Sequence, residues 1–472
     1  MTKNITRTLM AATFLLSCGA GVQGIEAKKV KLASQTDLHG IWQSEGYGYV
    51  VETDSKNVTL YDVTDRVCVR STEKAEQIKH YLQDTPPDVS PDKQTALFRT
   101  TLEDYAISLQ RISNLPAVCD KLTPNTPQEN FEAFVSYFET HYAFFDLYNV
   151  DWASAVAEKR PLVSDDTSDA DLFAIMKDLM QPMKDGHLSL SATIDGEKKI
   201  YGPNRGIITD TLSQRAKAEG TDRKGKSDAF LKKYWLEGVG EKILNGDGEL
   251  AAGFFIQYGM PTEDIAYIGF LTVAGFGNGD LLNERRDLAA LDKIMDKALA
   301  KFDKAGAKAV IIDLSTNLGG YDFISRKIAG RFADKKRFIY SKYAADRLNA
   351  EPHKQYVEPY STTGFTGPVY VLTSNATVSG GEILTMALRV LPNATHAGQA
   401  TRGALSDVLD KSLPNGWKLS LSNEVYTDAD GKKWEGRGIK PDLPITVFDP
   451  ENLTQSHIEA VKTLITHIRQ NH

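Results

Sequence analysis

The sequence predicts an α/β fold, and three stretches of the chain carry that prediction. A continuous apolar run at 309–314 is typical of a strand buried in a sheet whose faces are covered by helices. A second apolar run, at 369–373, leads through a short polar turn into an amphipathic helix. Between the two runs a further helix is expected at about 322–332. Strands that alternate with helices in this way indicate an α/β domain.

The length and composition of the chain restrict its class. At 472 residues it is long enough for two or three domains. A hydrophobic content of 41% and a charged content of 25% are typical of a globular protein. The net charge is −7 and no basic stripe is present, so nothing supports nucleic-acid binding. CxxC, HExxH and GxGxxG patterns are absent, and we predict neither a metal nor another cofactor.

Residues 1–27 have the pattern of an export signal. A positively charged start is followed by a short apolar run, Leu9–Leu16, and then by small residues. The segment ending at Cys18 is similar to a bacterial lipobox, in which that cysteine would carry a lipid and anchor the chain to a membrane. Ordinary cleavage at about 24–27 is the alternative. Either way we expect export to the periplasm or the cell envelope.

Residues 28–122 are expected to form a β-rich N-terminal domain. From Gly40 onward, aromatic and β-branched residues alternate with polar ones, and turn residues interrupt the alternation. Cys68 and Cys119 remain once Cys18 is set aside. An exported chain with two such cysteines favours one disulfide between them, and two buried free thiols are the alternative.

Residues 123–200 are expected to be mainly helical and to carry His187. An aromatic stripe at 131–145 recurs at helical spacing and predicts core packing. A second predicted helix runs into Asp185 and Gly186, which end it, so His187 lies at a turn. A lone histidine is more often structural than catalytic. The charged stretch at 201–264 is interpreted as an insertion or a lid.

Residues 265–450 contain the alternating strands and helices, and 451–472 a C-terminal helix. Ser379 lies in the turn after the strand at 369–373, at the start of a helix. A helix N-terminus offers unpaired N–H groups and partial positive charge, and the glycines that follow admit a substrate backbone. These conditions suit a serine nucleophile. The same residues also match a capping box ending at Glu382, so the local pattern leaves both interpretations open.

Four separated motifs in this order resemble the S41 family of serine peptidases: DGH at 185–187, VIIDLSTNLGG at 310–320, TSNATVSGGE at 373–382 and EGRGIKPD at 435–442. The resemblance extends over about 125–450. It implies a crotonase/ClpP-like α/β core.

One sequence position distinguishes the two catalytic mechanisms found in this family. Tail-specific members use a Ser–Lys dyad with the lysine in a T-x-G-K motif, and here Ala404 stands at that lysine position. Lys411 and Lys418 lie outside the motif. Tricorn-like members resemble a Ser–His–Glu arrangement, which implies Ser379 as nucleophile, His187 as base and Glu435 as orienting carboxylate.

The resemblance also implies the oxyanion donors, namely the N–H of Gly380 and that of Gly319 or Gly320, with Gly320 favoured. The function that follows is an exported serine peptidase that cleaves peptides or proteins through an acyl-enzyme. One alternative is an inactive relative that binds peptide or lipid. Another is an α/β-hydrolase-type esterase using His457 or His467, which lie in a terminal helix that we expect to be exposed. The oligomeric state is not predicted.

Overall fold

The computed structural model describes residues 38–471, except residue 55, most of 73–86 and of 100–105, residues 278 and 280–282, 348–350 and 361–362. The predicted export signal, including Cys18, lies outside the described residues. Among the described helices, none combines the length and the apolar character needed to cross a bilayer. The domain boundaries given above stay predictions.

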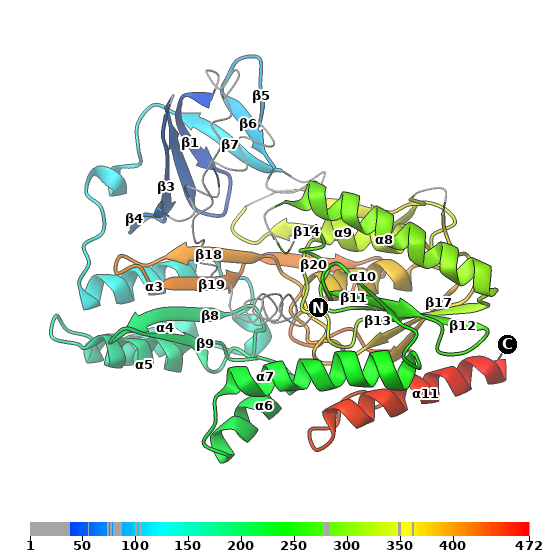
Figure 1. Ribbon diagram of the computed structural model, residues 1–472. Coiled ribbons are helices and arrows are strands. Elements are labelled where there is room, and N and C mark those ends of the chain that lie inside the picture. The colour runs from blue at the N-terminus through cyan, green and yellow to red at the C-terminus, as the bar shows by residue number, and fades with distance from the viewer. Residues whose placement is uncertain are drawn as a thin grey trace.

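The N-terminal part is a seven-stranded antiparallel sheet in the order β4-β3-β2-β1-β7-β6-β5, at the top of Figure 1. Its strands are β1 (Gly40–Ser44), β2 (Tyr49–Thr53), β3 (Val58–Val63), β4 (Cys68–Arg70), β5 (Asp88–Val89), β6 (Thr95–Phe98) and β7 (Ile107–Ile112). Cys68 at the start of β4 forms a disulfide with Cys119 in the short helix η2 (Ala117–Asp120), which confirms the predicted bond.

Three helices then pack on a four-stranded sheet. The helices are α3 (Pro127–His141), α4 (Trp152–Lys159) and α5 (Asp169–Met180), and the aromatic stripe of α3 is buried as predicted. The sheet has the order β18-β19-β8-β9, with β8 (Ser189–Ile194), β9 (Glu197–Tyr201), β18 (Val408–Ser412) and β19 (Lys418–Ser422). Because β8 pairs with β19, the chain just after His187 lies beside a segment more than 200 residues further on.

The central sheet has seven strands in the order β10-β11-β12-β13-β16-β17-β21. They are β10 (Glu249–Ala251), β11 (Ile256–Gly259), β12 (Ile265–Phe270), β13 (Ala309–Asp313), β16 (Val369–Thr373), β17 (Ala394–Gly398) and β21 (Leu443–Pro444). From β12 to β21 the strands are parallel, an arrangement that fits the predicted α/β domain. The apolar runs form its centre, since every residue of β13 and β16 is buried.

Helices cover both faces of this sheet (Figure 1). They are α6 (Ile207–Ala218), α7 (Arg223–Leu231), the π-helix η5 (Lys232–Ile243), α8 (Glu284–Ala305), α9 (Asp322–Gly330), α10 (Gly380–Arg389) and α11 (Leu453–Asn471). A small third sheet, β15-β14-β20, joins β14 (Arg337–Ala344) to β15 (His353–Val357) and β20 (Glu424–Asp428).

The expectation that His457 lies on an exposed helix face was wrong. His457 is fully buried in α11, and its Nε2 lies 2.6 Å from Oδ2 of Asp313 at the end of β13. The buried carboxylate requires a polar partner, and α11 supplies it. His457 is therefore part of the packing between α11 and the central sheet. His467 is half-buried.

Candidate active site

The turn between β16 and α10 holds Ser379 in an unusual backbone conformation. Its φ is 56° and its ψ is −126°, a region that residues with a Cβ rarely adopt. Such a conformation costs on the order of 1–3 kcal/mol and persists only where the surroundings impose it. Here the Ser379 N–H donates to the Ala404 carbonyl at 3.0 Å, and the preceding Val378 N–H donates to the Asn317 carbonyl at 3.1 Å.

Glu382 fixes this turn from inside the protein. Its buried carboxylate accepts hydrogen bonds from the Ser379 N–H at 3.2 Å and from the Thr401 hydroxyl at 2.6 Å. It also accepts from the N–H groups of Gly403 and Ala404, both at 2.8 Å. Burial raises the pKa of Glu382, and these donors oppose the rise. Glu382 therefore ties the Ser379 turn to the 401–404 loop.

Two backbone N–H groups near Ser379 have no acceptor among the described residues, those of Gly320 and Gly380. The Gly319 N–H, in contrast, donates to Asn317 Oδ1 at 2.9 Å. Gly320 and Gly380 are in close contact, because a Cβ on Gly380 would lie 2.9 Å from the Gly320 nitrogen. Of the predicted oxyanion donors, Gly380 and Gly320 thus have available N–H groups and Gly319 does not.

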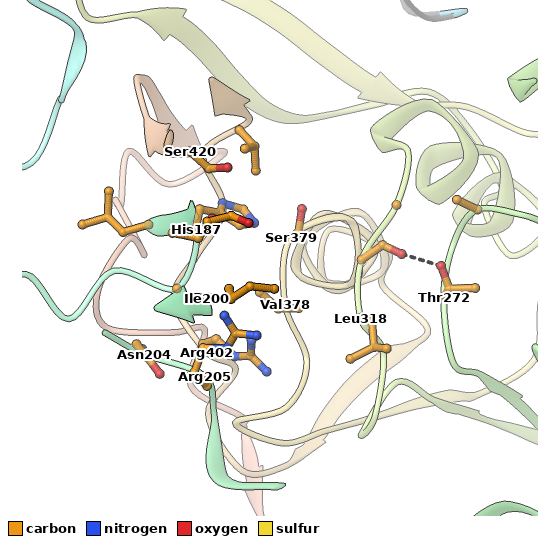
Figure 2. A pocket seen from close by; sticks show the side chains of 18 of the residues that line it. His187, Ile200, Asn204, Arg205, Thr272, Leu318, Val378, Ser379, Arg402 and Ser420 are labelled. Atoms are coloured by element: carbon orange, nitrogen blue, oxygen red, sulfur yellow. Dashed lines mark hydrogen bonds between the residues drawn. The ribbon is translucent and has the colours of Figure 1, made fainter. Parts of the chain in front are cut away.

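Ser379 and His187 line the same cavity, of about 330 Å³. Figure 2 shows Ser379 between His187 on one side and Leu318 with Thr272 on the other. Gly319 and Gly320 also line it, and Gly319 is in close contact with Ser379. No hydrogen bond joins the Ser379 hydroxyl to His187 in the described structure. In unliganded sites such bonds are often long and tighten when substrate binds.

His187 is half-buried at the turn between α5 and β8, where Asp185 holds its backbone. The His187 N–H donates to Asp185 Oδ1 at 2.8 Å, and this carboxylate also accepts from the hydroxyls of Tyr142 and Ser422. Burial is the main cause of a lowered pKa of His187, which the charges of Asp185 and Asp407 oppose. The imidazole is therefore favoured in its neutral form, in which it can accept a proton.

Glu435 is buried, and no hydrogen bond joins it to His187 in the described structure. Its Oε2 accepts from the N–H groups of Leu405 and Ser406, each at 3.0 Å. The Ser406 backbone also acts to raise the pKa of His187, so Ser406 is a neighbour of both side chains. His187 Nδ1 and Glu435 Oε1 are both buried, and no described residue gives either a hydrogen bond. Burial raises the pKa of Glu435 well above its usual range.

The lysines that the sequence placed near the motif lie elsewhere. The Lys411 ammonium is buried and donates to the Tyr47 and Gly48 carbonyls and to Asp62. Lys418 donates to the Ser412 hydroxyl at 3.1 Å. Among the described residues that line the Ser379 cavity there is no lysine. A Ser–Lys pair is not formed in this structure.

Two residues of the site were not singled out from the sequence. Asn317 is fully buried, donates to the Phe270 carbonyl at 3.0 Å and accepts from Gly319, so it shapes the glycine loop. An asparagine before a glycine pair at the end of a buried strand was a usable signal. Arg402, which lines the cavity, occupies the variable position of the 401–404 motif and gave no such signal.

Comparison with known families gives two matches. The model described as "Peptidase family S41" matches residues 267–445, and the model described as "Tricorn protease C1 domain" matches residues 123–181. Ser379, Glu435 and both candidate oxyanion glycines lie in the first segment, whereas His187 lies between the two.

Curated relatives match a part of the chain. The "Carboxy-terminal processing protease CtpA" of Bacillus subtilis is 27% identical over 175 residues, which is 36% of this chain and 35% of that protein. A "Probable CtpA-like serine protease" of Staphylococcus aureus is 25% identical over 197 residues, 42% of this chain and 36% of that protein. The chain thus spans about a third of the length of these relatives.

Solved structures share the fold. A putative peptidase from Parabacteroides merdae has a TM-score of 0.56 and 23% identity, covering 72% of this chain and 96% of that one. Mature CPAF complexed with lactacystin has a TM-score of 0.52 and 11% identity, covering 74% and 99%. The expected α/β fold with a ClpP-like core and a small N-terminal β part is confirmed. The segment that builds the strands and turns of this cavity, residues 267–445, belongs to peptidase family S41.

Proposed function

We propose that the chain is a serine peptidase that cleaves peptide bonds through an acyl-enzyme. One observation carries the proposal: a strained serine and a histidine favoured in its neutral form line one cavity, beside two backbone N–H groups that have no acceptor among the described residues. Strain at a residue with a reactive side chain is typical of functional sites.

The steps follow from the positions of these groups. His187 takes the proton from the Ser379 hydroxyl as Oγ attacks the substrate carbonyl carbon. The negative charge that forms on the carbonyl oxygen is stabilised by the N–H groups of Gly320 and Gly380. His187 then gives its proton to the leaving amine, and a water activated by the same imidazole hydrolyses the acyl-enzyme.

Glu435 acts on His187 through a bridging water in this proposal. His187 Nδ1, Glu435 Oε1 and the Tyr148 hydroxyl are buried polar atoms to which no described residue is hydrogen-bonded. Burial raises the pKa of Tyr148, and the charges of Asp185 and Glu435 add to the rise, so the hydroxyl lies near both carboxylates. Buried water commonly satisfies such groups. A bridged carboxylate would still favour the histidine tautomer in which Nδ1 carries the proton.

The test is Ser379→Ala, assayed by hydrolysis of a peptide library and by labelling with a fluorophosphonate. We expect loss of hydrolysis by at least about 10³-fold and loss of the label, with a far-UV circular dichroism spectrum like that of the wild type. Ser164→Ala, at an exposed position away from the cavity, is the matched control. If Ser379→Ala keeps its activity, Ser379 is not the nucleophile. If the unsubstituted chain binds peptides but neither cleaves them nor takes up the label, it is a binding protein on a peptidase fold.

We also propose that the chain is exported, on the basis of the pattern at 1–27 and the Cys68–Cys119 disulfide. Mass spectrometry of the mature N-terminus tests this proposal. A lipid-modified Cys18 indicates membrane anchoring, a start at about 24–27 indicates ordinary cleavage, and an intact Met1 contradicts export.

A further inference from the structure

Tyr47 joins the N-terminal sheet to the part of the chain that carries the active site. It lies in the turn between β1 and β2, with a φ of 61° that is uncommon for a residue with a Cβ. Its hydroxyl donates to Oε1 of Glu424 in β20 at 2.6 Å, across 377 positions of sequence. Its N–H donates to Asp346 Oδ2 at 2.8 Å, and its carbonyl accepts from the Lys411 ammonium at 2.5 Å. The turn is therefore fixed by its backbone, and its side chain is held against Glu424.

Glu424 belongs to a cluster of three carboxyl groups around one buried ammonium. The Lys342 Nζ lies 2.6 Å from Asp407 Oδ2, 3.2 Å from Glu424 Oε2 and 3.7 Å from Asp322 Oδ2. The Tyr426 hydroxyl lies between Lys342 and Asp322, at 3.0 Å from each. One positive charge does not balance three negative ones at these distances, so one of the carboxyl groups keeps its proton.

Glu424 is the group that holds this proton. Its side chain is 2% exposed, whereas that of Asp407 is 50% exposed. Burial raises the pKa of Glu424 to about 8, the Lys342 charge opposes the rise and the Asp407 charge adds to it. The side chains of Glu424 and Asp407 are hydrogen-bonded to each other. Two ionised carboxylates have no donor for such a bond, so at neutral pH Glu424 donates to Asp407 while it accepts from Tyr47.

The segment that Glu424 contacts, residues 406–407, is also a neighbour of His187. The Glu424 N–H donates to the Ser406 hydroxyl at 3.0 Å, so the backbone and the side chain of Glu424 both hold this segment. The Ser406 N–H donates in turn to Glu435 Oε2 at 3.0 Å. The 406–407 segment is therefore held by Glu424 and by Glu435, the carboxylate assigned to the imidazole.

The charges that face His187 include one from this segment. Burial lowers the pKa of His187, and the charges of Asp185 and Asp407 oppose the fall. The Arg402 charge adds to the fall, and the Ser406 backbone opposes it. A displacement of residues 406–407 would thus change the surroundings of the imidazole.

We propose that Glu424 and Tyr47 are positioning residues of the peptidase: the neutral carboxyl group of Glu424, held by the Tyr47 hydroxyl, fixes the 406–407 segment beside His187. This inference rests on the proposed function. Neither residue lines the Ser379 cavity, so their loss should lower kcat and leave KM unchanged. When Glu424 ionises it loses the proton that it donates to Asp407, and two like charges then face one another. The value of kcat should therefore fall as the pH rises through about 8.

Glu424→Gln is the first test, because an amide donates and accepts as the neutral acid does but does not ionise. In the unsubstituted chain we expect kcat to fall at least about fivefold between about pH 7 and about pH 9.5, the equivalent of one hydrogen bond. Glu424→Gln should equal the unsubstituted chain within about twofold at pH 7 and keep that rate at the higher pH. Glu249→Gln, which replaces a carboxylate that pairs with lysines of α8, is the matched control and should retain the alkaline fall.

Tyr47→Phe is the second test, because it removes the hydroxyl and keeps the ring. We expect kcat to fall at least about threefold at pH 7, with KM within about twofold of the unsubstituted value. Tyr258→Phe is the matched control, since the Tyr258 hydroxyl donates to Glu249 Oε2 at 3.0 Å in the same way. That variant loses a similar hydrogen bond and should leave kcat unchanged.

The imidazole itself supplies a measurement that does not depend on hydrolysis. The ring of His187 is followed by NMR in the full chain with carbon-13-labelled histidine, and its signal is assigned with His187→Gln. Because burial lowers the pKa of His187, the ring stays neutral above pH 7, so a change in its signal there reports a neighbouring group. We expect a change with a midpoint at about pH 8 in the unsubstituted chain and none in Glu424→Gln.

Three results overturn the proposal: the unsubstituted chain shows no transition near pH 8, the transition survives in Glu424→Gln, or Tyr47→Phe has the kcat of Tyr258→Phe. A transition that survives in Glu424→Gln belongs to another group, such as Glu435, whose pKa is also raised by burial. Failure of the proposed function is a separate result, read from the unsubstituted chain as absent hydrolysis and absent labelling. The His187 signal would still show in that case whether Glu424 acts on the imidazole.

Discussion

Replacement of Gly319 by alanine tests how closely the glycine loop packs against the nucleophile. Gly319 has a φ of 88°, and a Cβ there would lie 2.7 Å from the Ser379 Cβ and 3.0 Å from the Val378 carbonyl oxygen. A left-handed backbone costs an L-residue about 1–2 kcal/mol, and overpacking adds about 1–3 kcal/mol. We therefore expect Gly319→Ala to lower the free energy of unfolding by about 2–5 kcal/mol.

Gly306→Ala is the matched control for backbone conformation. Gly306 ends α8 with a φ of 72°, and a Cβ there would meet no atom within 4 Å. For Gly306→Ala only the cost of the left-handed backbone, about 1–2 kcal/mol, should reduce the free energy of unfolding. The difference between the two variants, measured by urea denaturation, isolates the contact with Ser379.

The two variants should differ more strongly in reactivity. The contact displaces Ser379 or the loop, and a misplacement on the order of 1 Å costs about 100-fold in rate. We expect fluorophosphonate labelling of Gly319→Ala to slow by at least about tenfold, with Gly306→Ala unchanged. If Gly319→Ala folds and is labelled at the wild-type rate, the glycine loop does not position the nucleophile and the reasoning is refuted.

Two further predictions concern buried charges. Only neutral imidazole can accept the Ser379 proton, and burial lowers the pKa of His187 below 6.5, so kcat/KM should stay constant down to a pH below that value. Asp407→Asn removes a negative charge that raises the pKa of His187, so the pH below which kcat/KM falls should become still lower. A fall in kcat/KM that begins above pH 6.5, or a shift to higher pH in Asp407→Asn, contradicts the assignment of His187 as base. Lys411→Met leaves Asp62 buried without its ammonium partner and should lower the free energy of unfolding by about 3–5 kcal/mol. Lys432→Met, which removes the ammonium of an exposed ion pair, should change the free energy of unfolding by less than about 0.5 kcal/mol. Equal effects of Lys411→Met and Lys432→Met would contradict a larger contribution of the buried pair.

Much of the fold follows from local pattern. The buried strands were predicted from uninterrupted apolar runs, because a strand covered on both faces leaves no position for a polar residue. The disulfide followed from the number of cysteines and the expected compartment. His457 was misjudged because the whole terminal helix was expected to be exposed, although a spacing of four from Leu453 and from Val461 places it on the buried face. Its partner Asp313 is 144 positions away in sequence. Pairings of buried polar groups over such distances leave no periodic signal.

The site was predictable in its residue types and less so in its geometry. The order of the motifs predicted that Ser379 and His187 belong to one site, and in the structure both line one cavity. The positive φ of Ser379 could not be predicted from the sequence. The three-dimensional contacts of the turn impose this conformation, and a serine does not favour it by itself. The sequence also did not show that Glu435 forms no hydrogen bond with His187. Sequence order shows which residues are available, whereas the hydrogen bonds of Glu435 to the 405–406 backbone depend on the three-dimensional fold.

The position where the lysine of the T-x-G-K motif would stand lies beside the turn that carries His187. Ala404 is fully buried, and a Cβ on Gly186 would lie 2.8 Å from the Ala404 Cβ. The turn that carries His187 therefore packs directly on residue 404. A longer side chain there would occupy the space that this turn needs, so a lysine at 404 and a histidine delivered by this turn exclude one another in this packing. The small residues at 186 and 404 are thus two parts of one arrangement, which lets the turn that carries His187 line the same cavity as Ser379.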